Sequence, residues 1–262
     1  MRHHEDTLGA FVERVKADPN AIAVILVGSV ARGTERPDSD VDVYLVVPDD
    51  VFDSAMAADR VIFDERSDAV YPGGYVDVKL ASVSFLDAAA ERGDDPVRAS
   101  FEGARVAWVR SGYDIAGRVA AIPVLPPMVW ESRVVSFMSQ VWWWGTDFLP
   151  QAVALDNTFL LHHAAVHTVG AGGRALLALN RTLFRGPRYL DATLATLDRK
   201  PDGYDVLARQ LITQPSREGA EAYVQALESF HHWPVDRESS ASIFIRDNEL
   251  AWLTEVLPPE LR

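Results

Sequence analysis

The first 27 residues pair an amphipathic segment with a continuous apolar run. Apolar side chains between Leu8 and Val15 recur at the spacing of one helical face, and Asp18-Pro19-Asn20 then ends the predicted helix. The run from Ala21 to Val27 is too short for a buried helix and is rich in β-branched residues. It predicts a central strand that is covered on both faces.

The segment 40–47 alternates instead between polar and apolar positions. Asp40, Asp42 and Tyr44 fall on one side of the predicted strand, while positions 41, 43 and 45 carry valine or leucine on the other. This strand therefore has an apolar back and an acidic front.

Further short elements complete the first half of the chain. The pattern predicts strands from residue 61, at 75–81 and at 105–109, and helices at 49–58, 85–91 and 96–103. Asp77 lies between two valines in the second of these strands, after a Pro-Gly-Gly turn at 72–74.

A proline-rich segment at 122–127 breaks the pattern and is the best candidate for a domain boundary. Almost everything beyond it has helical spacing, and the predicted helices are 128–148, 157–184, 190–197, 204–212, 218–233 and 240–257. The expected fold class is α+β. A small mixed-sheet domain at 1–122 is followed by an all-α helical bundle domain at 128–262.

Composition narrows the chemistry. The chain has no cysteine, which excludes disulfides, thiolate nucleophiles and cysteine-ligated zinc, so that any metal is bound by oxygen or histidine. The N-terminal segment lacks the apolar stretch of a signal peptide, and no apolar run is long enough for a membrane span. We therefore expect a cytoplasmic protein with no membrane partner.

The formal net charge of −13 argues against a nucleic-acid partner, because binding a phosphate backbone calls for a basic surface. It suits a small cationic acceptor better. Charge does not decide whether a nucleotide binds, since metal ions and a few arginines can attract one locally.

The acidic front of strand 40–47 suits metal chemistry. Two aspartates at i and i+2 project from one face, and close carboxylates are needed to hold two metal ions roughly 3.5–4 Å apart. Asp77 is a candidate third carboxylate, because an unpaired charge in an apolar strand is costly without a metal. Its alternative interpretation is a solvated residue on an edge strand.

Gly28-Ser29 follows the first buried strand and can form a small anion cradle. The glycine permits close approach of a phosphate, and the serine hydroxyl and adjacent N–H groups can donate to it. Arg32, Gly33 and Thr34 in the next loop are further candidates for phosphate contacts.

Gly28-Ser29, a gap of ten residues, Asp40-Val41-Asp42 and a later Asp77 together resemble the signature of the DNA polymerase β-type nucleotidyltransferase superfamily. A transferase domain followed by a helical bundle is similar to the aminoglycoside and lincosamide nucleotidyltransferases within it. The segment 179–190, LNRTLFRGPRYL, resembles a stretch found in some of their relatives.

The resemblance implies transfer of a nucleoside monophosphate from an NTP, most simply ATP, to a hydroxyl of a small acceptor, with release of pyrophosphate. The acceptor would be an aminoglycoside-like antibiotic, which would make the protein an antibiotic-resistance enzyme. Asp40 and Asp42 would hold two Mg²⁺ ions. Asp77 would ligate the ion nearer the acceptor and is a candidate to take its proton.

The nucleotide is expected to contact Gly28, Ser29, Arg32 and Arg188, with the helical domain completing the nucleotide and acceptor cleft. Arg188 belongs to a set with Arg181 and Arg185 around a Gly-Pro turn, and these arginines are alternatively solvated charges at helix ends.

Other functions stay open at this point. One is nucleotidylylation of a protein, and another is a regulatory module that binds a nucleotide without turnover. Transfer to a nucleic-acid end is disfavoured by the acidic charge. The chain is expected to be a monomer or a homodimer.

Two aromatic features of the helical half have structural and functional interpretations. Consecutive tryptophans at 142–144 cannot all face one core, so one of them is a candidate for stacking on a base or sugar, against packing in the bundle or a dimer interface. His163 and His167 have the i, i+4 spacing of a zinc pair, but no third ligand is evident and packing is favoured.

Overall fold

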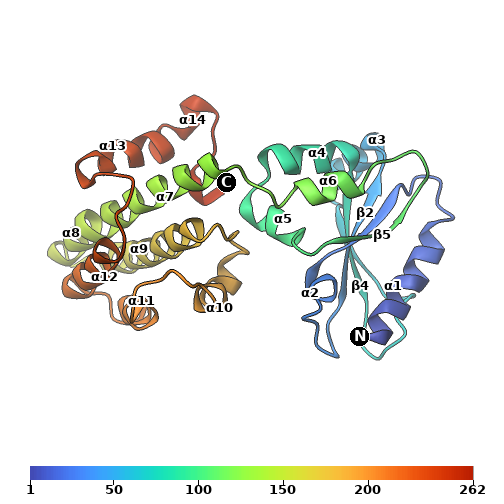
Figure 1. Cartoon of the computed structure of the whole chain (residues 1–262), viewed down its shortest axis with the longest axis horizontal. Helices are drawn as coiled ribbons and strands as arrows, with labels where there is room; N and C mark the ends of the chain where they lie inside the picture. The colour runs from blue at the N-terminus through green and yellow to red at the C-terminus, as the bar shows by residue number, and fades with distance from the viewer. Residues whose placement is uncertain (262) are drawn as a thin grey trace. The chain divides into compact units, whose positions relative to one another are not determined.

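The computed structural model describes residues 1–261 and divides into two compact units, Met1–Val124 and the segment from Leu125 onward (Figure 1). The first unit is built on a mixed sheet and the second is almost entirely helical. The predicted α+β fold class is confirmed.

A five-stranded sheet forms the centre of the first unit. Its strands are β1 (Ala23–Leu26), β2 (Val41–Val47), β3 (Ile62–Glu65), β4 (Val76–Ser82) and β5 (Arg105–Val109). Their spatial order is β3-β4-β2-β1-β5, and only the β2–β4 pair is parallel. Strand β1 is fully buried along its length, as its continuous apolar sequence predicts.

Helices cover both faces of this sheet (Figure 1). They are α1 (Arg2–Val15), α2 (Gly28–Arg32), α3 (Asp49–Ala57), α4 (Val83–Arg92), α5 (Asp95–Ser100) and α6 (Ala116–Ala121). The apolar stripe of α1 packs with the odd-numbered valines of β2, whereas Tyr44 packs on the other side with residues of α4 and α6. The alternation predicted for strand 40–47 is therefore correct.

Two helices of the first unit were not predicted from the sequence. Residues 28–32 form the short helix α2, where a loop carrying Arg32 was expected. Helix α6 was not predicted, because only Val119 within its six residues is buried and no side chain caps it. The helix predicted at 49–58 is α3, and the carboxylate of its first residue, Asp49, accepts a 2.9 Å hydrogen bond from the Ser84 hydroxyl.

The second unit is a helical bundle in which α7 packs along α9 (Figure 1). Its α-helices are α7 (Pro127–Trp142), α8 (Leu149–Ala154), α9 (Thr158–Leu179), α10 (Leu190–Ala195), α11 (Tyr204–Thr213), α12 (Arg217–Phe230), α13 (Ser240–Phe244) and α14 (Ala251–Thr254). Two π-helical turns, η1 (Trp143–Phe148) and η4 (Ile245–Glu249), and three 3₁₀ turns, η2 (Pro187–Tyr189), η3 (Arg237–Ser239) and η5 (Pro259–Leu261), connect or extend them.

The predicted helix boundaries in this unit need three corrections. The helix predicted at 218–233 ends at Phe230. The helix predicted at 157–184 ends at Leu179, and Arg181 just after it adopts a positive φ of 53°. The helix predicted at 240–257 is divided by η4 and ends at Thr254. Backbone geometry of this kind is set by packing and leaves no periodic signal in the sequence.

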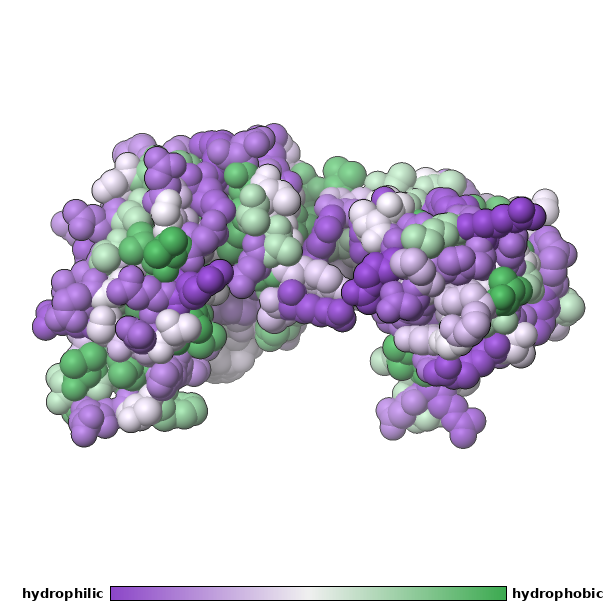
Figure 2. Space-filling view, turned by 90° about the horizontal axis from the view of Figure 1, so that it is seen from below, coloured by the Kyte–Doolittle hydropathy of each residue, from purple (hydrophilic) through white to green (hydrophobic). Residues whose placement is uncertain are grey.

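The face of the molecule in Figure 2 is mainly hydrophilic, with apolar side chains scattered in small groups. Within residues 1–261, no helix combines the length and apolarity needed to cross a membrane.

Candidate active site

Three carboxylates meet at one end of the β2–β4 pair. Asp42 and Asp77 are direct partners in the parallel register of these strands, so their side chains project from the same face. Asp40 lies one residue before β2 begins, and its i, i+2 spacing from Asp42 places it on the same face. One carboxylate oxygen of each aspartate lies within 4.8 Å of the other two.

This cluster holds unfavourable negative charge. Burial, reinforced by the neighbouring Asp40, raises the pKa of Asp42 to about 6. Burial likewise raises the pKa of Asp77. Among the described residues, Asp77 Oδ1 is buried without a hydrogen-bond partner. A divalent cation would supply the missing positive charge and a ligand for that oxygen, so the donor set fits a hard metal ion.

The position of β4 decides between the two interpretations of Asp77. Because β4 lies between β3 and β2, it is an internal strand and Asp77 is only partly accessible. The alternative interpretation, a solvated residue on an edge strand, is therefore wrong.

Gly28, from the glycine-serine pair, lies directly against the carboxylate of Asp42. It adopts a positive φ of 68°, and a Cβ atom at this position would lie 2.0 Å from Asp42 Oδ2. The adjacent Val27 N–H also donates to the Asp42 carbonyl at 3.0 Å. Only glycine leaves room here for the carboxylate.

Ser29 and Arg32 follow on α2, which starts at Gly28 and places them next to the acidic cluster. The N–H groups of a first helical turn have no partner within their own helix and can donate to an anion. Arg32 occupies the last turn, and its charge opposes the rise in the Asp42 pKa. Gly33 ends the helix with a left-handed φ of 69°.

Two residues next to the cluster were missed in the sequence. The Tyr75 hydroxyl donates to Asp40 Oδ2 at 3.0 Å. Lys79 partly offsets the effect of burial on the pKa values of both Asp42 and Asp77. Both positions lie two residues from Asp77, so strand alternation could have found them.

The remaining predicted residues lie in the second unit. Arg188 is in η2, with its guanidinium carbon 5.5 Å from the centroid of the Tyr189 ring, and its contact with a nucleotide stays a prediction. The His163 and His167 rings are 4.2 Å apart, and burial lowers the pKa of His167. Across residues 1–261, the three aspartates are the one group of three or more His, Cys, Asp or Glu residues placed to hold a metal. A zinc site at the histidines therefore has no support.

The three tryptophans all pack within the second unit. Trp143 stacks on Phe244 with ring centroids 5.1 Å apart, and Trp144 stacks on His167 at 4.8 Å. Trp142 is buried, and its indole N–H donates to Glu228 Oε1 at 2.7 Å.

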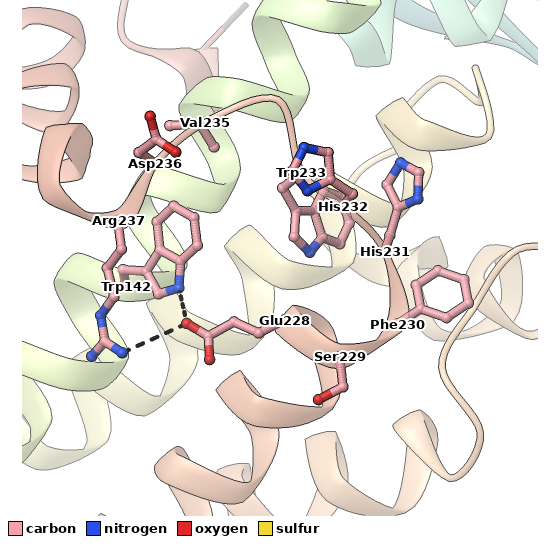
Figure 3. A pocket seen from close by; sticks show the side chains of 10 residues that line it. All are labelled: Trp142, Glu228, Ser229, Phe230, His231, His232, Trp233, Val235, Asp236 and Arg237. Carbon is pink, nitrogen blue, oxygen red and sulfur yellow. Dashed lines mark hydrogen bonds and ion pairs between the residues drawn. The ribbon is translucent and has the colours of Figure 1, made fainter.

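Trp142 also lines a pocket of about 460 Å³ at the end of α12 (Figure 3). Glu228 accepts from Trp142 there and pairs with Arg237 at 3.6 Å. The predicted carboxylates and phosphate-binding residues do not line this pocket.

The segment that contains the three aspartates matches a known protein family. Residues 8–84 match the model of the nucleotidyltransferase domain family, and this range includes Gly28-Ser29 and all three aspartates. The resemblance to the DNA polymerase β-type nucleotidyltransferase superfamily is confirmed for these residues. Residues 8–84 therefore carry a nucleotidyltransferase domain, which supports a transferase.

Other comparisons are more distant. A solved structure of a nucleotidyltransferase-like protein from Exiguobacterium sibiricum 255-15 is 14% identical and has a TM-score of 0.47. The match covers 93% of this chain and 77% of that one. The search of curated proteins gives no match.

Proposed function

We propose that this nucleotidyltransferase domain moves a nucleoside monophosphate from ATP to a hydroxyl group of a small acceptor in a Mg²⁺-dependent reaction. The proposal rests on the convergence of Asp40, Asp42 and Asp77 beside Gly28. In the reaction the acceptor oxygen forms a bond to the α-phosphorus. The bond from that phosphorus to the bridging oxygen breaks, and pyrophosphate leaves with the bonding electrons.

Asp40, Asp42 and Asp77 would hold two Mg²⁺ ions. Such ions, when bound, neutralise charge on the phosphates and favour the ionised form of an attacking hydroxyl. The three carboxylates would hold such ions at one place, because each aspartate offers an oxygen within 4.8 Å of the other two.

Asp77 is also proposed to accept the proton of the acceptor hydroxyl. A carboxylate has two oxygens, so Asp77 can offer one to a metal ion and the other to the proton. In this role the proton moves from the hydroxyl to an Asp77 oxygen as the new bond forms.

Gly28, Ser29 and Arg32 are proposed to bind the phosphates of the nucleotide. The first turn of α2 offers backbone donors, and Arg32 supplies positive charge within the same short helix. The closeness of Gly28 to Asp42 would keep bound phosphate next to the metal ligands.

The acceptor is proposed to be cationic and hydroxylated, like an aminoglycoside antibiotic, with cytoplasmic antibiotic resistance as the corresponding role. The support is the net charge of −13, which favours encounter with a polycation. Two alternative functions would replace this proposal: nucleotide transfer to a protein, and nucleotide binding without turnover.

The deciding experiment incubates the protein with mixed NTPs, Mg²⁺ and a panel of aminoglycosides and hydroxylated metabolites. Pyrophosphate release and a gain of one nucleotide in acceptor mass are expected. Asp42→Asn and Asp77→Asn should abolish both signals, whereas Asp53→Asn, an exposed aspartate of α3, should leave them unchanged.

Three results would contradict the proposal. Turnover that survives both site substitutions would exclude the aspartates as the reacting centre. A mass gain of one nucleotide that appears only on a protein would indicate a protein acceptor in place of the small one. Nucleotide binding without pyrophosphate release from any acceptor would indicate a sensor.

A further inference from the structure

Asp40 is held differently from the other two carboxylates. Asp42 and Asp77 lie inside β2 and β4 and face each other in register, so the sheet itself fixes their backbones. Asp40 precedes the first residue of β2. Contacts from outside the strand ladder must therefore set the direction of its side chain.

Tyr75 makes the contact with the Asp40 carboxylate. Its hydroxyl donates to Asp40 Oδ2 at 3.0 Å, and its carbonyl accepts from the N–H of Val41 at 3.1 Å. The same residue thus binds the side chain of Asp40 and the backbone that follows it. The Arg66 guanidinium carbon lies 4.9 Å from the centroid of the Tyr75 ring, which supports the ring independently of its hydroxyl.

A second pair of donors holds the peptide before Asp40. The Ser39 carbonyl accepts from the Tyr71 hydroxyl and from His4 Nε2, the latter at 3.0 Å. Since a carbonyl oxygen only accepts, His4 carries its proton on Nε2. His4 is fully buried, and its ring meets Tyr71 edge-on with centroids 5.1 Å apart. The peptide between Ser39 and Asp40 is therefore fixed by one residue from α1 and one from the loop before β4.

We propose that Tyr75 is a positioning residue for the metal centre, orienting Asp40 as a ligand while Tyr71 and His4 fix the peptide that carries it. The inference rests on the proposed function, because it assumes that Asp40 binds metal. Its chemistry is that of ligand carboxylates in general, whose direction and basicity are set by hydrogen bonds from neighbouring groups.

The protonation state of Tyr75 is consistent with this role. A phenol has an ordinary pKa of about 10, so the Tyr75 hydroxyl that donates to Asp40 is neutral near neutral pH. It can orient one oxygen of Asp40 without adding negative charge to the cluster.

The test compares Tyr75→Phe with the wild type and with Tyr113→Phe, a control at an exposed tyrosine of the same unit. Phenylalanine keeps the ring against Arg66 and removes the donor alone. The measurement is Mn²⁺ affinity of the otherwise metal-free protein, by calorimetry or by electron paramagnetic resonance, without nucleotide. Thermal unfolding without metal is recorded for each variant.

We expect Tyr75→Phe to bind Mn²⁺ at least fivefold more weakly than both references while retaining a cooperative unfolding transition; losses of about 10–100-fold are typical of such partners. A smaller change overturns the inference. Asp42→Asn separates the two proposals. If it abolishes Mn²⁺ binding while Tyr75→Phe does not weaken it, Tyr75 is structural and the metal centre stands. If the wild type itself does not bind Mn²⁺, the metal centre and the inference both fail.

Discussion

Asp42 and Asp77 lie directly opposite each other on β2 and β4, the only parallel pair of the sheet. Their side chains therefore project side by side from the same face of the sheet. The two aspartates are 35 positions apart in sequence, so the pairing of strands brings them together. The predictions below follow from that pair and its surroundings.

Metal binding should stabilise the folded protein. Mg²⁺ at about 100 times its dissociation constant is expected to raise the free energy of unfolding by roughly 2.7 kcal/mol, because the unfolded chain does not hold the three aspartates together. Urea unfolding with and without a chelator measures this gain. Asp42→Asn should show no gain, and an equal gain in that variant would place the metal elsewhere.

In the metal-free protein, the contribution of Asp42 to the free energy of unfolding should fall as the pH rises from about 4 to about 6. The Asp42 pKa is near 6 in the folded state and near 3.8 unfolded, so in this range the folded state binds more protons. The difference corresponds to at most roughly 3 kcal/mol, and partial exposure of Asp42 reduces it. Above the folded pKa the loss is complete.

Comparison with Asp42→Asn isolates this titration, since asparagine has no charge. Relative to the wild type, the variant should gain about 1–3 kcal/mol in free energy of unfolding between pH 4 and pH 7, measured in urea with a chelator. A difference between the two proteins that does not change with pH would contradict the prediction.

Gly28→Ala should damage the site more than the fold. An added methyl group would lie 2.0 Å from Asp42 Oδ2, and the carboxylate must rotate away to make room. Gly33→Ala is the matched control, because Gly33 has a similar φ of 69° with nothing within 4 Å of the added Cβ.

Both alanine variants should lose about 1–2 kcal/mol from backbone strain, but only Gly28→Ala should lose Mn²⁺ binding and turnover. Urea unfolding and calorimetry check the two effects separately. Equal metal affinity in the two variants would show that the Gly28 contact has no role in the site.

Lys79→Met should raise the pKa of Asp42 further. Lys79 is the residue whose charge most opposes the effects of burial and of Asp40 on that carboxyl. Carboxyl ¹³C chemical shifts recorded against pH in metal-free protein measure the change directly. An unchanged or lower Asp42 pKa would mean that the ammonium group does not act on the cluster.

Gly172→Ala should destabilise the second unit by about 1–3 kcal/mol, because the new Cβ would lie 2.1 Å from the Tyr223 hydroxyl oxygen. That hydroxyl is buried and bonded to Tyr204 at 2.7 Å, so it has little freedom to move. Gly170→Ala, on the same helix with no atom within 4 Å, should instead stabilise by up to about 1 kcal/mol. Urea unfolding of the two variants measures both signs, and a stable Gly172→Ala protein would show that the bundle repacks.

Local patterns in the sequence predicted much of the first unit. The strand at 105–109 coincides with β5, and the alternation of 40–47 matches the two faces of β2. The same alternation places Tyr75 and Lys79 on the face of Asp77, although their importance was not recognised. Helices α2 and α6 and the π-helical turns were missed, because packing rather than periodicity decides them.

The sequence by itself determined the α+β class, the glycine-serine pair that directly follows a buried strand, and the two aspartates on one strand face. These features depend on neighbours within a few residues, where the 2.0 and 3.6 periods apply. Only the tertiary structure decided that β4 is internal and parallel to β2, which places Asp77 opposite Asp42. It also decided that Gly28 touches the Asp42 carboxylate and that Tyr75 binds Asp40. Such contacts join residues 14 to 35 positions apart, and strand order and side-chain packing, which local sequence does not encode, bring them together.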